Sequence, residues 1–255
     1  MAASPFDLSG RVALVTGAGG GLGFAIARGM ARAGATIVIN GRNRDKLHAA
    51  ASTLRDEGAS VHVAPFDVTD AVAVRAAIDD IERAAGPVDI LVNNAAMNKR
   101  GSLDGYATED WRALMAANLD GPFHVTQALL PGMKSRRTGK IVNICSLASD
   151  LGRPGIVPYA VTKGGLKQFT RALAVEVAAH NIQVNGIAPG FFRTEMNAPL
   201  VADAEFSAWV ARRTPAGRWG DPADIAGAAV FLASPAADYV TGSMLHVDGG
   251  FSASY

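Results

Sequence analysis

The chain has 255 residues, of which 49% are hydrophobic and 18% are charged, and its formal net charge is +1. This composition is typical of a folded globular protein and excludes an extended disordered chain. The near balance of charges offers no broad basic surface, so we expect neither nucleic acid nor an anionic membrane as a partner.

Short apolar runs alternate along the chain with longer amphipathic segments. The runs are rich in Val and Ile, and several are apolar on both sides, as in parallel strands covered on both faces. Strands are predicted at 12–16, 36–40, 61–66, 88–93, 140–145, 182–187 and 244–248, and helices at 21–33, 43–57, 70–85, 108–134, 158–180 and 221–234. This alternation predicts a single α/β domain over residues 1–255, with a Rossmann-type doubly wound parallel sheet and helices on both faces.

Residues 191–218 break this rhythm with prolines, a tryptophan and a run of small residues. We predict a short helical excursion over the carboxyl ends of the strands, where ligands bind in such folds. The excursion is either a substrate lid or a packed pair of peripheral helices, and the sequence leaves both open.

A glycine-rich loop, TGAGGGLG at residues 16–23, follows the first predicted strand and leads into a helix. Gly17 permits a tight turn, Gly21 lets the backbone approach a pyrophosphate, and Gly23 lets the helix pack closely on the sheet. Such a loop alone is a weak signal, but its place at the first strand-to-helix turn predicts a dinucleotide-binding site.

The second predicted strand ends in VINGRN, without the acidic residue that would bind a ribose 2′-hydroxyl and repel a 2′-phosphate. Arg42 can bind a 2′-phosphate through charge-assisted hydrogen bonds, which favours NADP over NAD. The alternative is a solvated surface arginine, and the glycine-rich loop carries no second basic residue. After the third strand, Asp67 is predicted to bind the adenine amino group and Val68 to line the ring. The alternative for Asp67 is a cap of the next helix, and the two roles are compatible.

The segment SLASDLGRPGIVPYAVTKGG, residues 146–165, places a tyrosine and a lysine four residues apart. Four residues are about one helical turn, so a helix that begins at Pro158 puts Tyr159 and Lys163 on the same face. A phenol beside an ammonium group can work as an acid–base pair, and it is also a common surface pair. The cation is expected to lower the pKa of the phenol from about 10.

These features together resemble the short-chain dehydrogenase/reductase family, over essentially the whole chain. The resemblance rests on TGAGGGLG (16–23), NNAA (93–96), MAANLDG (115–121), Ser146, YAVTK (159–163), PGFFRTEM (189–196) and VDGG (247–250). Ala96 departs from the family's usual glycine, which exchanges one small residue for another.

The resemblance implies a catalytic set of Asn118, Ser146, Tyr159 and Lys163. Tyr159 would be the general acid/base, Lys163 would also hold the nicotinamide ribose, and Ser146 would polarise the substrate oxygen. Asn118 would hold a water that relays protons to Lys163, whereas alone it is a helix-interior asparagine bound to backbone. Ser149 is a rival serine, but Ser146 keeps the family's spacing to Tyr159. No metal is expected.

The implied cofactor contacts come from both halves of the sheet. They are Gly17, Gly19, Gly21, Leu22, Gly23, Arg42, Asn43, Asp67, Val68, Asn94, Ala95, Tyr159, Lys163, Pro189, Gly190 and Thr194.

Within the family the chain is most similar to the gluconate 5-dehydrogenases, which interconvert D-gluconate and 5-keto-D-gluconate, usually with NADP. A sugar acid is an anion, so we expect a cation beside Ser146 and Tyr159, and Arg100 and Arg153 are the candidates. For each arginine, a solvated or subunit-contact role is the alternative. Another reductase, such as a 3-oxoacyl-carrier-protein reductase, and a non-catalytic NADP-sensing regulator stay open as alternative functions.

The N-terminal residues lack the pattern of a secretory signal, and no apolar run approaches the roughly 20 residues that span a bilayer. The single cysteine, Cys145, rules out an internal disulfide, and we expect a cytoplasmic protein. The family commonly forms homotetramers through the long helices around the catalytic strand, here 108–134 and 158–180, and we expect the same assembly.

Overall fold

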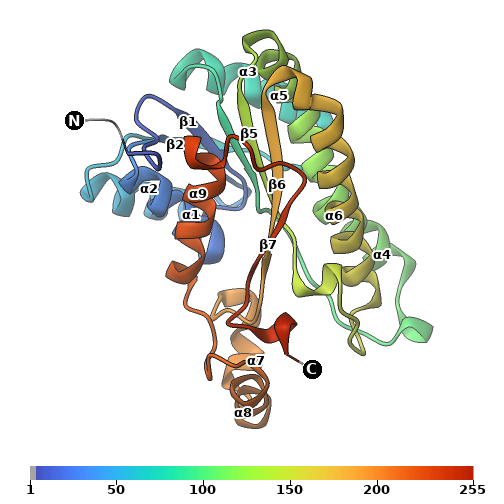
Figure 1. The fold of residues 1–255 in the computed structure, drawn as a ribbon. Coiled ribbons are helices and arrows are strands. Elements are labelled where there is room, and N and C mark those ends of the chain that lie inside the picture. Colours follow the sequence, from blue (N-terminus) through green and yellow to red (C-terminus); the bar gives the residue numbers. More distant parts are fainter. Residues whose placement is uncertain (1–3, 255) are drawn as a thin grey trace.

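A computed structural model describes residues 4–254, and its strands form one parallel sheet (Figure 1). Within these residues the sheet has seven strands in the order β3-β2-β1-β4-β5-β6-β7. They are β1 (Val12–Val15), β2 (Thr36–Gly41), β3 (Val61–Pro65), β4 (Ile90–Asn93), β5 (Gly139–Ile144), β6 (Ile182–Pro189) and β7 (Met244–Val247). The order reverses between β1 and β4, which is where ligands bind in such sheets. The predicted Rossmann-type doubly wound sheet is confirmed.

Helices connect the strands and cover both faces of the sheet, with α1, α2 and α9 on one side and α3, α5 and α6 on the other (Figure 1). They are α1 (Gly21–Arg32), α2 (Arg44–Asp56), α3 (Ala71–Ala85), α4 (Thr108–Met115), α5 (Gly121–Arg136), α6 (Val157–Val177) and α9 (Ala226–Ala233). Asn43 and Asp70 begin α2 and α3, because each side-chain oxygen accepts a hydrogen bond from a backbone N–H of the first turn. Among the described residues, no helix combines the length and the apolar character that crossing a membrane requires.

Each face of the sheet buries its own apolar cluster. Successive side chains of a strand point to opposite faces, so Ala13 and Val15 lie in one cluster while Val12 and Leu14 lie in the other. Helices α1, α2 and α9 contribute to the first cluster, and α3, α5 and α6 to the second. This burial on both faces explains why the strands are apolar at nearly every position.

The single helix predicted at 108–134 is interrupted, because a π-helical turn at Ala116–Asp120 separates α4 from α5. Asn118 lies in this turn and is fully buried, and its side chain bonds to the backbone of Met97. Hydrophobic periodicity could not show the interruption, since it depends on a contact between residues far apart in the sequence.

The predicted excursion at 191–218 contains two short helices, α7 (Ala198–Ala202) and α8 (Ala204–Arg213), at the bottom of Figure 1. Its interior is aromatic: the Phe191 ring centroid lies 5.8 Å from that of Phe206 and 5.7 Å from that of Trp209. The excursion is therefore a packed pair of helices, and its movement as a lid stays a prediction.

Candidate active site

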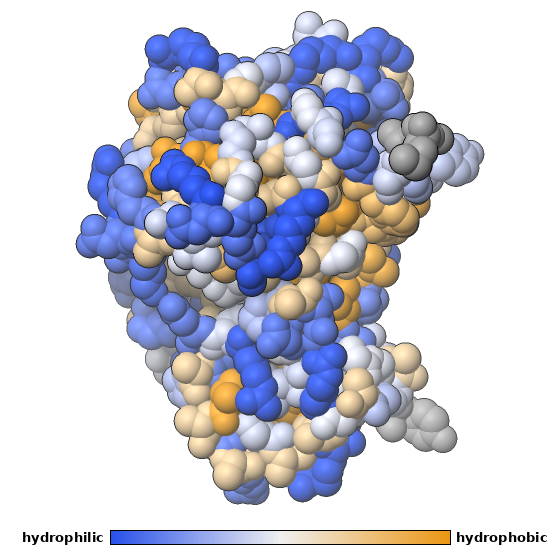
Figure 2. Space-filling view, turned by 90° about the vertical axis from the view of Figure 1, so that its left-hand side faces the viewer, coloured by the Kyte–Doolittle hydropathy of each residue, from blue (hydrophilic) through white to orange (hydrophobic). Residues whose placement is uncertain are grey.

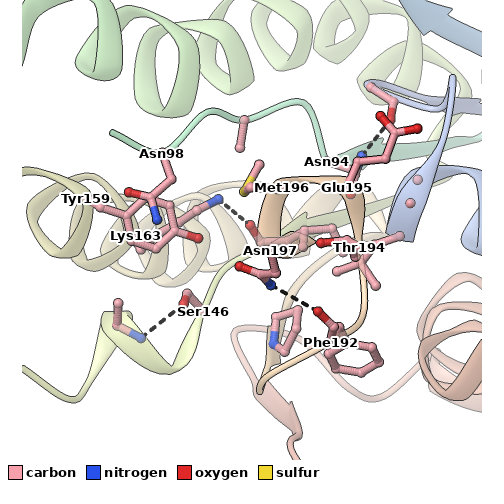
Figure 3. Close-up of a pocket in the computed structure, with 18 of the residues that line it drawn as sticks. Asn94, Asn98, Ser146, Tyr159, Lys163, Phe192, Thr194, Glu195, Met196 and Asn197 are labelled. Carbon is pink, nitrogen blue, oxygen red and sulfur yellow. Dashed lines mark hydrogen bonds between the residues drawn. The ribbon is translucent and has the colours of Figure 1, made fainter. Parts of the chain in front are cut away.

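A cleft of about 970 Å³ opens at the carboxyl ends of the strands, where the sheet order reverses. The glycine-rich loop, the loops after β2, β4 and β5, the first turns of α6 and the 191–218 excursion line it. In Figure 3, Tyr159 and Lys163 lie toward one end of the cleft, while Thr194 and Glu195 lie toward the other. Hydrophilic side chains surround a hollow on the face of the molecule drawn in Figure 2.

The glycine-rich loop forms a backbone cradle that side chains would fill. Gly17 has a φ of 64°, and a Cβ there would lie 2.8 Å from the Ala95 Cα. A Cβ at Gly23 would lie 2.4 Å from the Gly17 carbonyl oxygen. Helix α1 begins in this loop without a side-chain cap or an acidic residue in its first turn, so its N–H groups can bind an anion. The cradle fits the pyrophosphate of a dinucleotide.

Two side chains hold the cradle against the loop after β4. Asn94 Nδ2 donates to the carbonyl oxygens of Thr16 and Gly17, at 2.9 and 3.0 Å. The Thr16 hydroxyl accepts from the backbone N–H groups of Asn94 and Ala95, both at 3.0 Å. Asn94 and Ala95, predicted as cofactor contacts, therefore also fix the shape of the phosphate loop.

Most residues predicted to contact the cofactor line this one cleft. They are Gly17, Gly19, Gly21, Leu22, Gly23, Arg42, Asn43, Asn94, Ala95, Tyr159, Lys163, Pro189, Gly190 and Thr194. The two other predicted contacts, Asp67 and Val68, are not among its lining residues. Asp67 accepts hydrogen bonds from the backbone and hydroxyl of Thr69 and lies 3.7 Å from Arg42. The cap of α3 is Asp70, so the predicted helix-capping role of Asp67 is wrong.

Tyr159 and Lys163 lie one turn apart in α6, as their spacing predicts (Figure 3). Pro158 occupies the first turn of this helix, where proline is tolerated. Lys163 Nζ lies 5.8 Å from the centre of the Tyr159 ring and donates a 2.7 Å hydrogen bond to the Ile144 carbonyl oxygen. Lys163 is only 3% exposed, and burial lowers its pKa to about 8.

The pKa of Tyr159 is raised, so the prediction that its neighbouring cation lowers it is wrong. Burial disfavours the charged phenolate, and this effect exceeds the opposing effects of the Ser146 side chain and the Arg100 charge. Tyr159 therefore keeps its proton at neutral pH. A protonated phenol suits a general acid that donates to a carbonyl oxygen.

Ser146 and Ser149 differ in what their hydroxyl groups already bind. The Ser149 hydroxyl donates to the Lys163 carbonyl oxygen at 2.9 Å. The Ser146 oxygen accepts from the Ala148 backbone N–H at 3.1 Å, and the Ser146 side chain faces the Tyr159 phenol, whose pKa it lowers. Only Ser146 of the two lines the cleft among the described residues, so it is the serine placed to bind a substrate oxygen.

Asn118 lies behind the cleft rather than at its surface. Its Nδ2 donates to the Met97 carbonyl oxygen at 2.8 Å and to the Thr162 hydroxyl at 3.2 Å, and its Oδ1 accepts from the Met97 N–H at 2.8 Å. The Thr162 hydroxyl donates to the Tyr159 carbonyl oxygen at 2.8 Å. Asn118 therefore joins the loop after β4 to the helix that carries Tyr159, and its relay water stays a prediction.

Arg100 and Arg153 both line the cleft, and no carboxylate of residues 4–254 forms an ion pair with either. Partial burial lowers the pKa of both groups, and the Arg100 charge adds to the effect on Arg153. The Arg153 guanidinium lies over two rings, 5.4 Å from the centroid of Phe206 and 5.8 Å from that of Phe191. Two neighbouring cations without a carboxylate have the charge that would attract an anion.

The residues that line the cleft but were missed by the sequence prediction include Lys46, Asn98, Phe191 and Trp209. Asn98 Oδ1 is buried without a hydrogen-bond partner among the described residues. The polar run NKR at 98–100, which follows Met97 in the loop after β4, was the available signal for Asn98. Nothing local in the sequence pointed to Lys46, because its partner Glu195 is 149 residues away.

A dinucleotide cradle and a Ser–Tyr–Lys set in one cleft define an NAD(P)-dependent oxidoreductase that acts on CH–OH groups. The chain belongs to the short-chain dehydrogenase/reductase family, as the motifs predicted. The family model described as Enoyl-(Acyl carrier protein) reductase matches residues 17–252.

Several named proteins match nearly the whole chain in sequence or structure. The gluconate 5-dehydrogenase of Gluconobacter oxydans is 50% identical over 249 residues, which are 98% of this chain and 97% of that protein. The 5-keto-D-gluconate 5-reductase of Escherichia coli is 47% identical, with 96% of each chain covered. The crystal structure of a gluconate 5-dehydrogenase from Burkholderia cenocepacia, in complex with NADP and tartrate, matches with a TM-score of 0.95, 51% identity and 98% of both chains covered.

Proposed function

We propose that the chain interconverts D-gluconate and 5-keto-D-gluconate and uses NADP as its cofactor. The observation that carries this proposal is the pair Arg100 and Arg153, which no described carboxylate neutralises, in the cleft that holds Tyr159. A sugar acid brings the carboxylate that such a pair binds. The names of the two half-identical relatives support this substrate, and so does the tartrate in the Burkholderia complex, because tartrate is a small hydroxy acid.

The proposed chemistry assigns a proton-handling role to each catalytic residue. A bound nicotinamide supplies the hydride in reduction and accepts it in oxidation. In reduction, Tyr159 donates its phenolic proton to the substrate oxygen, and its raised pKa keeps that proton available at neutral pH. Ser146 donates a hydrogen bond to the same oxygen, and the Lys163 charge stabilises the phenolate that remains after proton transfer.

The proposed choice of NADP rests on the end of β2. Gly41, the last residue of β2, lines the cleft where a carboxylate would repel a 2′-phosphate. The neighbouring Asn40 is buried, and its Nδ2 donates to the carbonyl oxygens of Ala64 and Phe66. The Arg42 side chain lines the cleft and is 78% exposed, so it has the freedom to turn toward a phosphate. NADP in the crystal structure of the Burkholderia relative supports the same cofactor.

Steady-state kinetics with NADPH test the proposal, with 5-keto-D-gluconate, neutral ketohexoses and acetoacetyl thioesters as acceptors. We expect rapid turnover of 5-keto-D-gluconate. Arg100→Ala and Arg153→Ala should each raise the KM for this substrate about tenfold or more, because each removes a charge-assisted hydrogen bond. The KM for a neutral ketohexose should change little. Arg112→Ala removes an exposed arginine of α4 outside the cleft and is the matched control.

Three outcomes would contradict the proposal in different ways. An unchanged KM for 5-keto-D-gluconate in both arginine variants would show that Arg100 and Arg153 do not bind the substrate carboxylate. Faster turnover of an acetoacetyl thioester than of 5-keto-D-gluconate would indicate a 3-oxoacyl-carrier-protein reductase instead. Binding of NADPH without turnover of any acceptor would favour the NADP-sensing regulator.

A further inference from the structure

A second basic side chain lies at the adenosine end of the cleft, although the glycine-rich loop itself carries none. Lys46 belongs to the first turn of α2 and lines the cleft together with Arg42 and Asn43. Its side chain starts against the phosphate loop, since a Cβ at Gly19 would lie 3.3 Å from the Lys46 Cβ. Lys46 therefore stands between the phosphate loop and the end of β2, the two segments that surround the 2′-position of a bound adenosine.

In the structure the Lys46 ammonium pairs with a carboxylate from the other wall of the cleft. Lys46 Nζ lies 2.6 Å from Glu195 Oε2, and Glu195 follows Thr194 in the 191–218 excursion. The Glu195 carboxylate also lies over the phosphate loop, because a Cβ at Gly20 would be 3.9 Å from Glu195 Oε1. Glu195 thus places a negative charge beside the cradle that fits a pyrophosphate (Figure 3).

The Lys46–Glu195 ion pair contributes little to the stability of the fold, so Lys46 can exchange this partner for another anion. The side chains of Lys46 and Glu195 are 54% and 76% exposed, so water screens their attraction. Arg42 is held in a similar way, 3.7 Å from Asp67, with its side chain largely exposed. A phosphate dianion offers more negative charge and more acceptor oxygens than either carboxylate, so it competes well for both cations.

We propose that Lys46 is a second specificity residue for the 2′-phosphate of NADP, and that it exchanges Glu195 for this phosphate when the cofactor binds. The inference rests on the proposed use of NADP and adds a residue to it. Arg42 and Lys46 then share the phosphate, while Glu195 is a built-in competitor that weakens NADP binding. Release of Glu195 also removes one contact between α2 and the excursion that borders the substrate end of the cleft.

Calorimetric binding of NADPH and NADH tests the proposal without turnover, because the two ligands differ only in the 2′-phosphate. Lys46→Gln should weaken NADPH binding about tenfold and leave NADH binding within about twofold. Glu195→Gln should tighten the binding of both cofactors, because it removes a negative charge beside the pyrophosphate cradle, and should tighten NADPH binding severalfold more than NADH binding, because only NADPH gains the freed Lys46. Arg44→Gln is the matched control, since it removes a positive charge from the same helical turn at a residue that does not line the cleft.

The outcomes separate this inference from the proposed cofactor. If the wild-type chain binds NADH as tightly as NADPH, the proposed cofactor is wrong and the inference fails with it. If the wild type prefers NADPH but Lys46→Gln and Arg44→Gln alter that preference equally, only the inference is wrong. Equal weakening of NADPH and NADH by Lys46→Gln would likewise overturn it, because the lysine would then act on a part common to both cofactors.

Discussion

Tyr159 and Lys163 show how burial, rather than their mutual distance, decides the protonation of an acid–base pair. Burial raises the pKa of the phenol and lowers that of the ammonium group, so each group is pushed toward its neutral form. Lys163 retains its charge only below about pH 8. The phenol is therefore protonated near neutral pH and can donate its proton, as the proposed reduction requires.

The buried ammonium group of Lys163 leads to a prediction about stability. Its pKa in the folded chain, about 8, lies below the ordinary value of 10.5. The unfolded chain binds more protons between these two pH values, so the stability of the wild type rises with pH across that window. Below pH 8 the buried charge costs up to about 3 kcal/mol. Lys163→Met removes the titrating ammonium group. The free energy of unfolding of this variant minus that of the wild type should therefore decrease from pH 8 to pH 10.5.

Urea unfolding over this pH range measures the difference. Lys99→Met, at an exposed lysine, controls for the loss of a lysine in general. A difference between Lys163→Met and the wild type that stays constant with pH would show that the buried ammonium group does not titrate as described.

Aromatic rings of the 191–218 excursion contact the side chain of Arg153, a residue of the loop between β5 and α6. The Arg153 guanidinium lies 5.4 Å from the Phe206 ring centroid, and Phe206 is part of α8. The Phe191 ring, from the start of the excursion, lies on the same guanidinium at 5.8 Å. The excursion therefore positions one arm of the proposed carboxylate clamp, whether or not it moves.

This contact predicts that Phe206→Leu, which keeps an apolar side chain but removes the aromatic face, weakens anion binding. A cation–π contact contributes about 0.5–2 kcal/mol, so the KM for 5-keto-D-gluconate should rise between about twofold and thirtyfold. The KM for a neutral ketohexose and the kcat should change little. Kinetics of the single variants and of the double variant with Arg153→Ala provide the measurement.

The double variant makes this prediction specific. In the Arg153→Ala background the Phe206 ring has no cation to support, so Phe206→Leu should add nothing to the KM. Additive effects of the two substitutions would mean that Phe206 shapes the cleft independently of Arg153.

At the scale of the whole molecule, the sequence was most informative where residues near each other in the chain act together. Strand positions follow from runs of Val and Ile, and the Tyr159–Lys163 face follows from a spacing of one turn. The π-helical turn at Asn118 could not be predicted in this way, because the Asn118 side chain is bound to the backbone of Met97, outside the helix. The pKa of Tyr159 was equally inaccessible, since it reflects burial by elements that are distant in sequence.

The expected homotetramer is a prediction for the whole molecule that the exposed apolar side chains make specific. Phe123 of α5 is 45% exposed and Val161 of α6 is 46% exposed, and both helices cover the same face of the sheet. An interface there would bury both side chains, so Val161→Asp should shift the assembly to a smaller species in sedimentation velocity. Val72→Asp places the same charge on an exposed valine of α3, 69% exposed, and should leave the assembly unchanged. A monomeric wild type, or a tetramer that tolerates Val161→Asp, would exclude this interface.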